Sequence, residues 1–248
     1  MWLTAVYHQV SMFSLKPSDA TSTGGRSLLV PTPFSIKMAL LDVALRLYGE
    51  ASGSILFPLI RDLDIALSPP QQVVVNNCFV RIHKPRRPKG NTSDKEGDES
   101  EGSGDKGDGQ FIRSVAFREY VQYNGPLGVA LEVQTQTDAD TLALLLPQIT
   151  YFGKRGCLFQ IDSPPALVER LPTRQGYIPI NRSSEKGLEE GRGVLQVLDD
   201  CDAKLSFAKV NIYSNERMSL GKERVLRHIV LPYRQTRSSR GFTLYERN

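Results

Sequence analysis

The stretch from Val30 to Gly49 reads VPTPFSIKMALLDVALRLYG and contains the clearest helical signal in the chain. Thr32 suits the N-cap of a helix, and Pro33 suits the first helical position, where its missing N–H leaves no hydrogen bond unmade. Apolar side chains then recur on one face at helical spacing, at Ile36, Leu40, Val43 and Leu47. Glycine is common just beyond the last residue of a helix. The sequence therefore predicts a helix that begins at Pro33 and ends at Gly49.

Strand signals lie on both sides of this helix. Residues 2–13 are rich in β-branched and aromatic side chains with rough alternation, which predicts a strand. Beyond the helix, further strand signals occur at residues 65–67, 73–82, 111–123 and 127–133. Strand signals therefore both precede and follow the first predicted helix.

Between residues 90 and 110 the chain contains no apolar side chain, and acidic residues are frequent. Such a segment cannot offset its ordering entropy by burial, so we expect it to be disordered. The strands that flank it then form a long hairpin over residues 73–123. The simplest geometry is an arm that protrudes from the body and carries the acidic loop at its tip.

A second helix is predicted after residue 136. Thr137 with Asp140 makes a capping box, and Pro147 lies near the far end. The apolar face consists of Leu142, Leu145, Leu146 and Ile149. A basic turn at 153–156 and a strand at 157–161 follow. Two strand–helix–strand units around a hairpin are the outline of a ferredoxin-like, RRM-type α+β domain.

The predicted fold class is therefore α+β, with an RRM-type domain at residues 1–162 and the inserted hairpin within it. Residues 163–248 mix Pro/Gly turns with short strand signals at 194–198, 204–213 and 228–231. We interpret this part as a smaller, β-rich C-terminal lobe packed on the first domain.

Composition limits the classes of function. The 248 residues carry a formal net charge of +4, and the acidic residues at 94–108 leave the remainder distinctly cationic. A cationic surface attracts polyanions such as nucleic acid, although a basic protein without such a partner is an alternative. The three cysteines are far apart, which predicts reduced thiols and neither disulfides nor a zinc site. No leader or membrane-spanning run is present in the sequence, so we expect a cytoplasmic protein without cofactor, metal or membrane partner.

Two stretches carry basic residues that could contact phosphate. Lys37 follows the predicted helix start, where free N–H groups attract anions; an ordinary capped helix with a solvated lysine is the alternative. The arm interleaves Phe111, Phe117, Tyr120 and Tyr123 with the cations Lys84, Arg86, Arg87, Lys89, Arg113 and Arg118. Such a pattern suits single-stranded nucleic acid. In the other interpretation the aromatic rings belong to the core and the charges protect a strand edge.

The C-terminal run 231–247 is rich in arginine around a Ser/Gly turn, which suits phosphate contacts or a solvated end. The histidines, His8, His83 and His228, occur in separate predicted strands with no motif that joins them. Acid–base cleavage of RNA by His8 or His83 is conceivable in chemical terms, but lone histidines in strands are more often structural. The sequence therefore predicts no catalytic residue.

Three segments together resemble the RAMP superfamily of CRISPR proteins, and within it the Cas-five family. They are Val30–Leu40, Phe117–Val121 and Leu231–Arg247. The resemblance implies an RRM-like domain with an inserted β-hairpin thumb, which coincides with the predicted arm. It also implies binding of the repeat-derived 5′ handle of the guide RNA (crRNA). The handle contacts that it implies are Ser35, Lys37, Arg113, Arg118, Lys154 and Arg155, to which the turn with Arg237 and Arg240 is added.

This resemblance implies a non-catalytic subunit of a type I Cascade complex. Such a subunit caps a filament of Cas-seven-type backbone subunits, contacts the large subunit and meets target DNA indirectly. The RNA-processing branch of the family is similar but uses a Tyr with a Lys-His pair, and this chain has Arg118-Glu119 near the place of that pair. A metal-independent endoribonuclease that processes repeat RNA is the rival from the enzyme class, and a generic single-stranded RNA-binding module is the third alternative.

Overall fold

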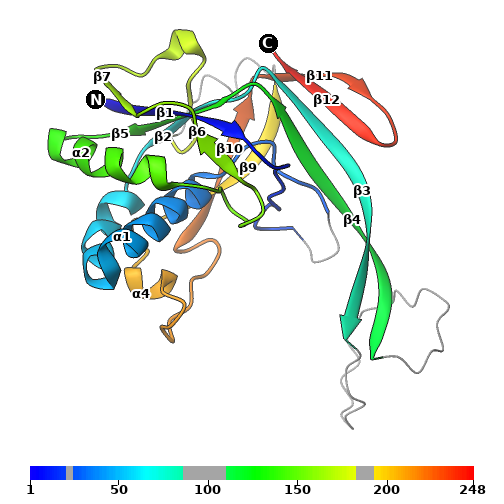
Figure 1. The fold of residues 1–248 in the computed structure, drawn as a ribbon, viewed down its shortest axis with the longest axis horizontal. Helices are drawn as coiled ribbons and strands as arrows, with labels where there is room; N and C mark the ends of the chain where they lie inside the picture. Colours follow the sequence, from blue (N-terminus) through cyan, green and yellow to red (C-terminus); the bar gives the residue numbers. More distant parts are fainter. Residues whose placement is uncertain (21–24, 86–109, 183–192) are drawn as a thin grey trace.

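A computed structural model describes residues 1–20, 25–85, 110–182 and 193–248 (Figure 1). These residues fold into a six-stranded sheet, a four-stranded sheet and a separate strand pair, with few helices. Pairing between the named strands of the described residues is antiparallel throughout. The expectation of a mixed fold with antiparallel sheets is confirmed.

The six-stranded sheet forms the centre of the body. Its strand order is β6-β1-β5-β2-β8, and β7 pairs with the first half of β1. The strands are β1 (Trp2–Gln9), β2 (Ile65–Ser68), β5 (Leu127–Glu132), β6 (Phe159–Ile161), β7 (Ala166–Val168) and β8 (Ile178–Pro179). Strands distant in sequence therefore lie next to one another in this sheet.

Helix α1 (Pro33–Arg61) begins where the sequence predicts, because the Thr32 side chain accepts a hydrogen bond from the Ser35 amide at 3.1 Å. The first helical segment stops at Gly49 as predicted, because Gly49 adopts a non-helical φ of 78° and ψ of 175°. A second helical segment, which was not predicted, follows directly across this kink. This segment is helical because Phe57 and Ile60 pack into the hydrophobic core.

Helix α2 (Gln136–Leu145) is capped by Thr135, whose side chain accepts from the Asp138 amide, so the capping box predicted at Thr137 is two residues too late. Pro147 lies in a 3₁₀ turn, η1 (Leu146–Gln148), directly after the helix. Both helices lie on one side of the six-stranded sheet (Figure 1). There the Tyr7 hydroxyl donates to the Leu146 carbonyl at 2.8 Å, which ties β1 to the end of α2.

The opposite face of this sheet has a smaller apolar cluster. Trp2, Ala66, Ala130 and Tyr177 form it. Val168 and Leu171 pack on it from the segment that contains the 3₁₀ turn η2 (Thr173–Gln175). Both faces of the sheet are therefore covered.

The four-stranded sheet has the order β11-β12-β3-β4. Strands β3 (Gln72–Pro85) and β4 (Phe111–Asn124) pair along their whole length, from Gln72 opposite Asn124 to Pro85 opposite Phe111. They form a long two-stranded ribbon that leaves the body, as Figure 1 shows. Strands β11 (Tyr233–Ser238) and β12 (Phe242–Arg247) form a second hairpin, which pairs through β12 with the base of β3.

The remaining elements are β9 (Val194–Cys201), β10 (Arg224–Leu231) and the short helix α4 (Phe207–Val210). The strand predicted at 204–213 is wrong, because Phe207 turns toward helix α1 and meets the Phe57 ring at 5.9 Å between centroids. Leu198, Leu205 and Leu231 belong to the same buried cluster as the N-terminal strands. Residues beyond 162 therefore add strands to the six-stranded and four-stranded sheets, form the β9–β10 pair, and share the large buried cluster.

Candidate nucleic-acid interface

A pocket of about 270 Å³ opens beside the start of α1. Its lining comes from four separate parts of the chain, namely the loop before α1, the first turns of α1, the turn at 151–154 and the strand pair β9–β10. The lining residues are Leu15, Thr32, Phe34, Ser35, Met38, Ala39, Tyr151, Gly153, Lys154, Asp199 and Arg224. We call this cavity the α1 pocket.

Ser35 lies in the wall of the α1 pocket, but Lys37 does not reach the surface. The Lys37 side chain is 2% exposed, and its Nζ donates to Asp200 Oδ1 at 2.7 Å. Asp200 also accepts hydrogen bonds from the Cys201 amide at 2.8 Å and from Asn181 Nδ2 at 3.2 Å. The direct phosphate contact predicted for Lys37 is therefore replaced by a buried ion pair between α1 and β9.

Arg224 closes one side of the α1 pocket and was not predicted from the sequence. Its guanidinium carbon lies 4.3 Å from the centroid of the Phe34 ring. The same guanidinium pairs with Asp199, whose side chain is 4% exposed. This arrangement fixes the arginine and neutralises its charge. No local motif points to it, because the partners are brought together only by tertiary structure.

A cluster of cations adjoins the α1 pocket. Partial burial, followed by the nearby charges of Arg118 and Lys154, lowers the pKa of Lys16 below its ordinary value. These three residues, which we call the cationic cluster, come from the loop after β1, from β4 and from the turn after η1. Neighbouring cations such as these attract an anion.

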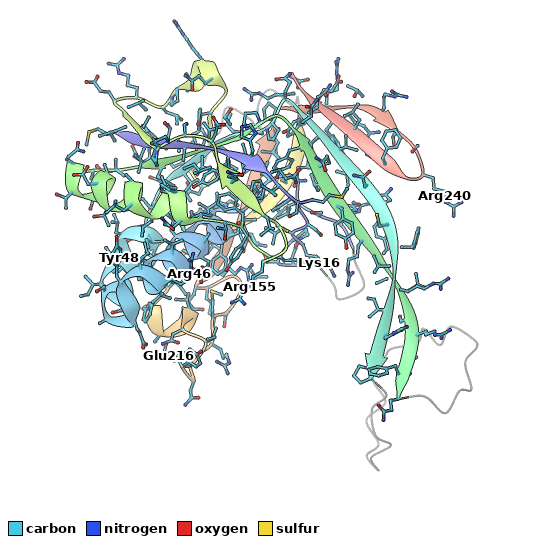
Figure 2. All side chains as sticks on the ribbon, viewed as in Figure 1. Lys16, Arg46, Tyr48, Arg155, Glu216 and Arg240 are labelled. Carbon is cyan, nitrogen blue, oxygen red and sulfur yellow. The ribbon has the colours of Figure 1, made fainter. Side chains whose placement is uncertain are left out.

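Two of the predicted contacts, Arg118 and Lys154, thus both lie near Lys16, which was not predicted. Arg155 is exposed in the same turn as Lys154. Figure 2 labels Lys16 and Arg155 between α1 and the ribbon in that view. A lysine in a polar loop carries no sequence signal of its own, so only its nearness to the charges of Arg118 and Lys154 in the folded chain shows its place.

The ribbon has an aromatic and basic face. Directly opposite residues share a face in an antiparallel pair, so the rows Phe79/Phe117, Arg81/Val115, His83/Arg113 and Pro85/Phe111 all point the same way. Phe79 is 69% exposed, and its ring lies 5.6 Å from the Phe117 ring. We call this surface the ribbon face. Arg113 was predicted as a contact, whereas Phe79, Arg81 and His83 were not.

Nearer the body, the same face of the ribbon becomes core. Val73, Val75, Val121 and Tyr123 are buried, and the Tyr123 hydroxyl donates to the Leu29 carbonyl at 2.8 Å. Of the aromatic residues predicted to interleave the arm, Tyr123 is therefore structural and Phe111 is exposed.

The remaining predicted contacts lie elsewhere. Arg237 and Arg240 are exposed on the β11–β12 hairpin, and Figure 2 shows Arg240 at the end of that hairpin away from the body. The hairpin is attached to the ribbon, because the Asn77 amide donates to the Gly241 carbonyl at 2.8 Å. The Lys84 side chain, Arg86 and Arg87 lie outside the described residues, as does the predicted acidic loop up to residue 109.

The three histidines do not come together. His8 on β1 has its Nε2 3.0 Å from Asp162 Oδ1 at an exposed site, His83 lies on the ribbon face, and His228 lies on β10 opposite Val197. Among the residues that the structure describes, no group of His, Cys, Asp or Glu is arranged to hold a metal ion. No helix in the described ranges is long and apolar enough to cross a membrane.

Comparison with known proteins gives one clear sequence relative, although no family model matches the chain. The chain is 23% identical over 223 residues to the CRISPR-associated protein Cas5 of Archaeoglobus fulgidus, and the match covers 87% of this chain and 86% of that protein. The resemblance to the Cas-five family indicated by the sequence motifs is confirmed by this match.

Two solved structures have similar chains at low identity. A CRISPR protein from Archaeoglobus fulgidus is 10% identical, with a TM-score of 0.43 and coverage of 100% of this chain and 92% of that one. A chain of a CRISPR RNA-guided surveillance complex is 17% identical, with a TM-score of 0.45 and coverage of 92% of this chain and 88% of that one.

Proposed function

We propose that this chain, a relative of Cas5, is a non-catalytic subunit of a type I CRISPR Cascade complex that binds the 5′ handle of the guide RNA. The observation that carries the proposal is the joint presence of the cationic cluster beside the ribbon's base and of the ribbon face farther along the same pair of strands. A single strand needs cations for its phosphates and flat rings for its bases, and these two surfaces supply both.

The order of elements supports an RRM-type, ferredoxin-like domain. The path β1–α1–β2–β5–α2–β6 has two strand–helix–strand units, and the sheet order is β6-β1-β5-β2. The ribbon β3–β4 is inserted between β2 and β5. Its length, exposed end and position suit a thumb that lies across a bound strand, which is the role that we assign to it.

The cationic cluster provides the phosphate contacts in this proposal. Arg118 is half-buried, and its guanidinium donates to the Phe117 carbonyl at 3.0 Å, which limits its motion. Lys154 is exposed at the rim of the α1 pocket. A fixed arginine and an accessible lysine near each other can hold successive phosphates of one strand.

The same proposal assigns the partners. The chain would cap a filament of Cas-seven-type backbone subunits, contact the large subunit and meet target DNA only through the guide, in the prokaryotic cytoplasm. The exposed arginines of the β11–β12 hairpin, Arg237 and Arg240, are secondary RNA contacts in this scheme because they lie on a different hairpin from the cationic cluster.

A binding experiment tests the handle. Fluorescence anisotropy with a labelled RNA that carries the repeat-derived handle, against a scrambled RNA of equal length at the same salt, should show preference for the handle. Arg118→Ala with Lys154→Ala should lower affinity and make the slope of log K against log salt shallower by about 1.4, since about 0.7 is lost for each phosphate contact to a single strand. Arg46→Ala, which removes an exposed cation of α1, is the matched control and should change neither quantity.

A cleavage experiment tests the absence of catalysis. Purified protein incubated with labelled repeat RNA in EDTA should leave the RNA intact, because the histidines lie on separate elements. Specific cleavage that yields a 2′,3′-cyclic phosphate and is lost in His8→Ala or His83→Ala would show the chain to be an endoribonuclease. Equal affinity for handle and scrambled RNA would instead support a generic single-strand binder.

A further inference from the structure

We infer that the α1 pocket receives one unstacked base of the bound RNA, while the adjoining phosphate lies on Lys154. This inference rests on the proposed function and extends it from the backbone of the handle to one of its bases. It assigns a base-binding role to Phe34, Met38 and Tyr151, which were not among the predicted RNA contacts and do not belong to the ribbon face.

The lining of the α1 pocket suits a flat, largely apolar ring. Leu15, Phe34, Met38, Ala39 and Tyr151 supply its apolar walls. A volume of about 270 Å³ lies just below the range of roughly 300–1,000 Å³ typical of pockets for drug-sized ligands. The pocket therefore has room for one ring system of about ten non-hydrogen atoms, the size of a base splayed from a single strand.

The charges around the pocket favour a neutral base inside and a phosphate at the rim. Inside, the guanidinium of Arg224 is already neutralised by Asp199 and held over Phe34. At the rim, Lys154 is exposed and belongs to the cationic cluster. A free anion would be drawn to the rim, whereas a base attached to a strand can enter the neutral interior while its phosphate stays outside.

The polar groups in the wall offer both kinds of hydrogen bond. Thr32 Oγ1 accepts from the Ser35 amide at 3.1 Å, and Ser35 Oγ donates to the Thr32 carbonyl at 2.8 Å. A hydroxyl has one donor and two acceptor sites, so Thr32 keeps its O–H and Ser35 keeps acceptor capacity. The edge of a base that enters the pocket can therefore meet a donor and an acceptor on the first turn of α1.

The position of the pocket in relation to the ribbon supports the same occupant. Arg118 of the cationic cluster is on β4, and Lys154 of the cluster is on the pocket rim. A strand whose phosphates follow the cluster would pass from the base of the ribbon to the mouth of the pocket. The base at that point is the one that the pocket would accept.

An abasic scan tests this inference. Handle RNAs in which one nucleotide at a time lacks its base are compared by anisotropy with the intact RNA. One position should stand out, with affinity lowered by about 5- to 150-fold, the range that stacking of one base on aromatic side chains gives. Met38→Trp, which fills the pocket from a half-buried position, should lower affinity for the intact RNA by a similar factor and abolish the sensitivity at that position.

Leu144→Trp on the exposed side of α2 is the matched control and should keep the abasic profile of the natural chain. Tyr151→Ala is a second variant that removes a ring without filling the pocket, and it should reduce the sensitivity at the same position. The two pocket variants, Met38→Trp and Tyr151→Ala, are compared only if thermal unfolding shows that they are folded. If Met38→Trp does not fold, the binding profile of Tyr151→Ala decides the question.

The outcomes separate the inference from the proposed function. A flat abasic profile with preference for the handle retained overturns the base pocket and leaves handle binding standing. Failure to prefer the handle overturns the proposed function itself. An unchanged RNA profile in Met38→Trp, together with lost assembly with a backbone subunit, would show that a protein side chain occupies the pocket and would overturn the inference.

Discussion

Replacement of Lys37 by methionine separates a structural role from an RNA-binding role. Lys37 and Asp200 form an ion pair at 2.7 Å with 2% and 4% of their side chains exposed. Removal of one partner of such a buried pair costs about 3–5 kcal/mol, because the other charge stays buried without compensation. Asp200 would still accept hydrogen bonds from Cys201 and Asn181. We therefore expect Lys37→Met to lower the free energy of unfolding by about 3 kcal/mol, the lower end of that range.

Urea unfolding followed by circular dichroism measures this loss. A double-mutant cycle with Asp200→Asn should give a coupling of about 2 kcal/mol, within the range found for side chains in direct contact. The exposed pair of Arg46 and Asp42, at 3.0 Å on the same helix, is the internal comparison. Arg46→Met should cost no more than about 0.5 kcal/mol, as is usual for exposed pairs one helical turn apart.

RNA affinity decides between the two roles. In Lys37→Met, the fraction of protein that remains folded should bind handle RNA with unchanged affinity, whereas Lys154→Ala should bind more weakly at unchanged stability. The opposite pattern, a Lys37→Met protein of full stability and reduced RNA affinity, would refute the reasoning from burial.

Two further changes test the local structure. Gly49 has φ 78° and ψ 175°, a conformation nearly restricted to glycine, so Gly49→Ala should lower the free energy of unfolding by about 1–3 kcal/mol although the added methyl meets no atom within 4 Å. Urea unfolding checks this, and an unchanged midpoint would contradict it. The hydrogen bond from Lys209, together with that from the Ser219 amide, lowers the pKa of Glu223 from 4.5 to about 2. The ionised Glu223 carboxylate stabilises the fold fully at pH values above 4.5, its pKa in the unfolded chain, and this stabilisation is lost as the pH falls through about 2. The free energy of unfolding should therefore decline between pH 4.5 and pH 2, and Glu223→Gln should flatten that part of the pH profile.

The start of α1 could be predicted because its signals are local. The cap at Thr32, the proline that follows it and the regularly spaced apolar residues are neighbours in sequence, so they determine the first turns of the helix without help from the rest of the chain. The continuation beyond Gly49 could not be predicted in the same way, because it depends on tertiary burial of Phe57 and Ile60. Likewise, nothing local distinguishes the alternation at 204–213 from a strand, and the packing of Phe207 on Phe57 decides in favour of a short helix.

The candidate site was predicted in part, and the reason is again the range of the interactions. The sequence identified Arg118 and Lys154 as cations but could not tell them from Lys37, whose partner Asp200 is 163 residues away. Burial of a lysine depends on what the rest of the chain brings to it. The place of Arg224 beside Phe34 has the same origin, since the two belong to β10 and α1.

The attachment of the ribbon explains why the proposed RNA surfaces keep a fixed spacing. The loop before α1 is bonded to β4, because the Glu119 amide donates to the Gly25 carbonyl at 2.9 Å and the Ser27 amide donates to Glu119 Oε2 at 2.7 Å. The approach is so close that a Cβ on Gly25 would lie 2.0 Å from the Phe117 carbonyl oxygen. This contact holds the loop that carries Lys16 against the strand that carries Arg118. Because the same strand continues into the ribbon face, the cations and the aromatic rings are positioned by one set of backbone contacts before any RNA binds, which lowers the entropic cost of binding.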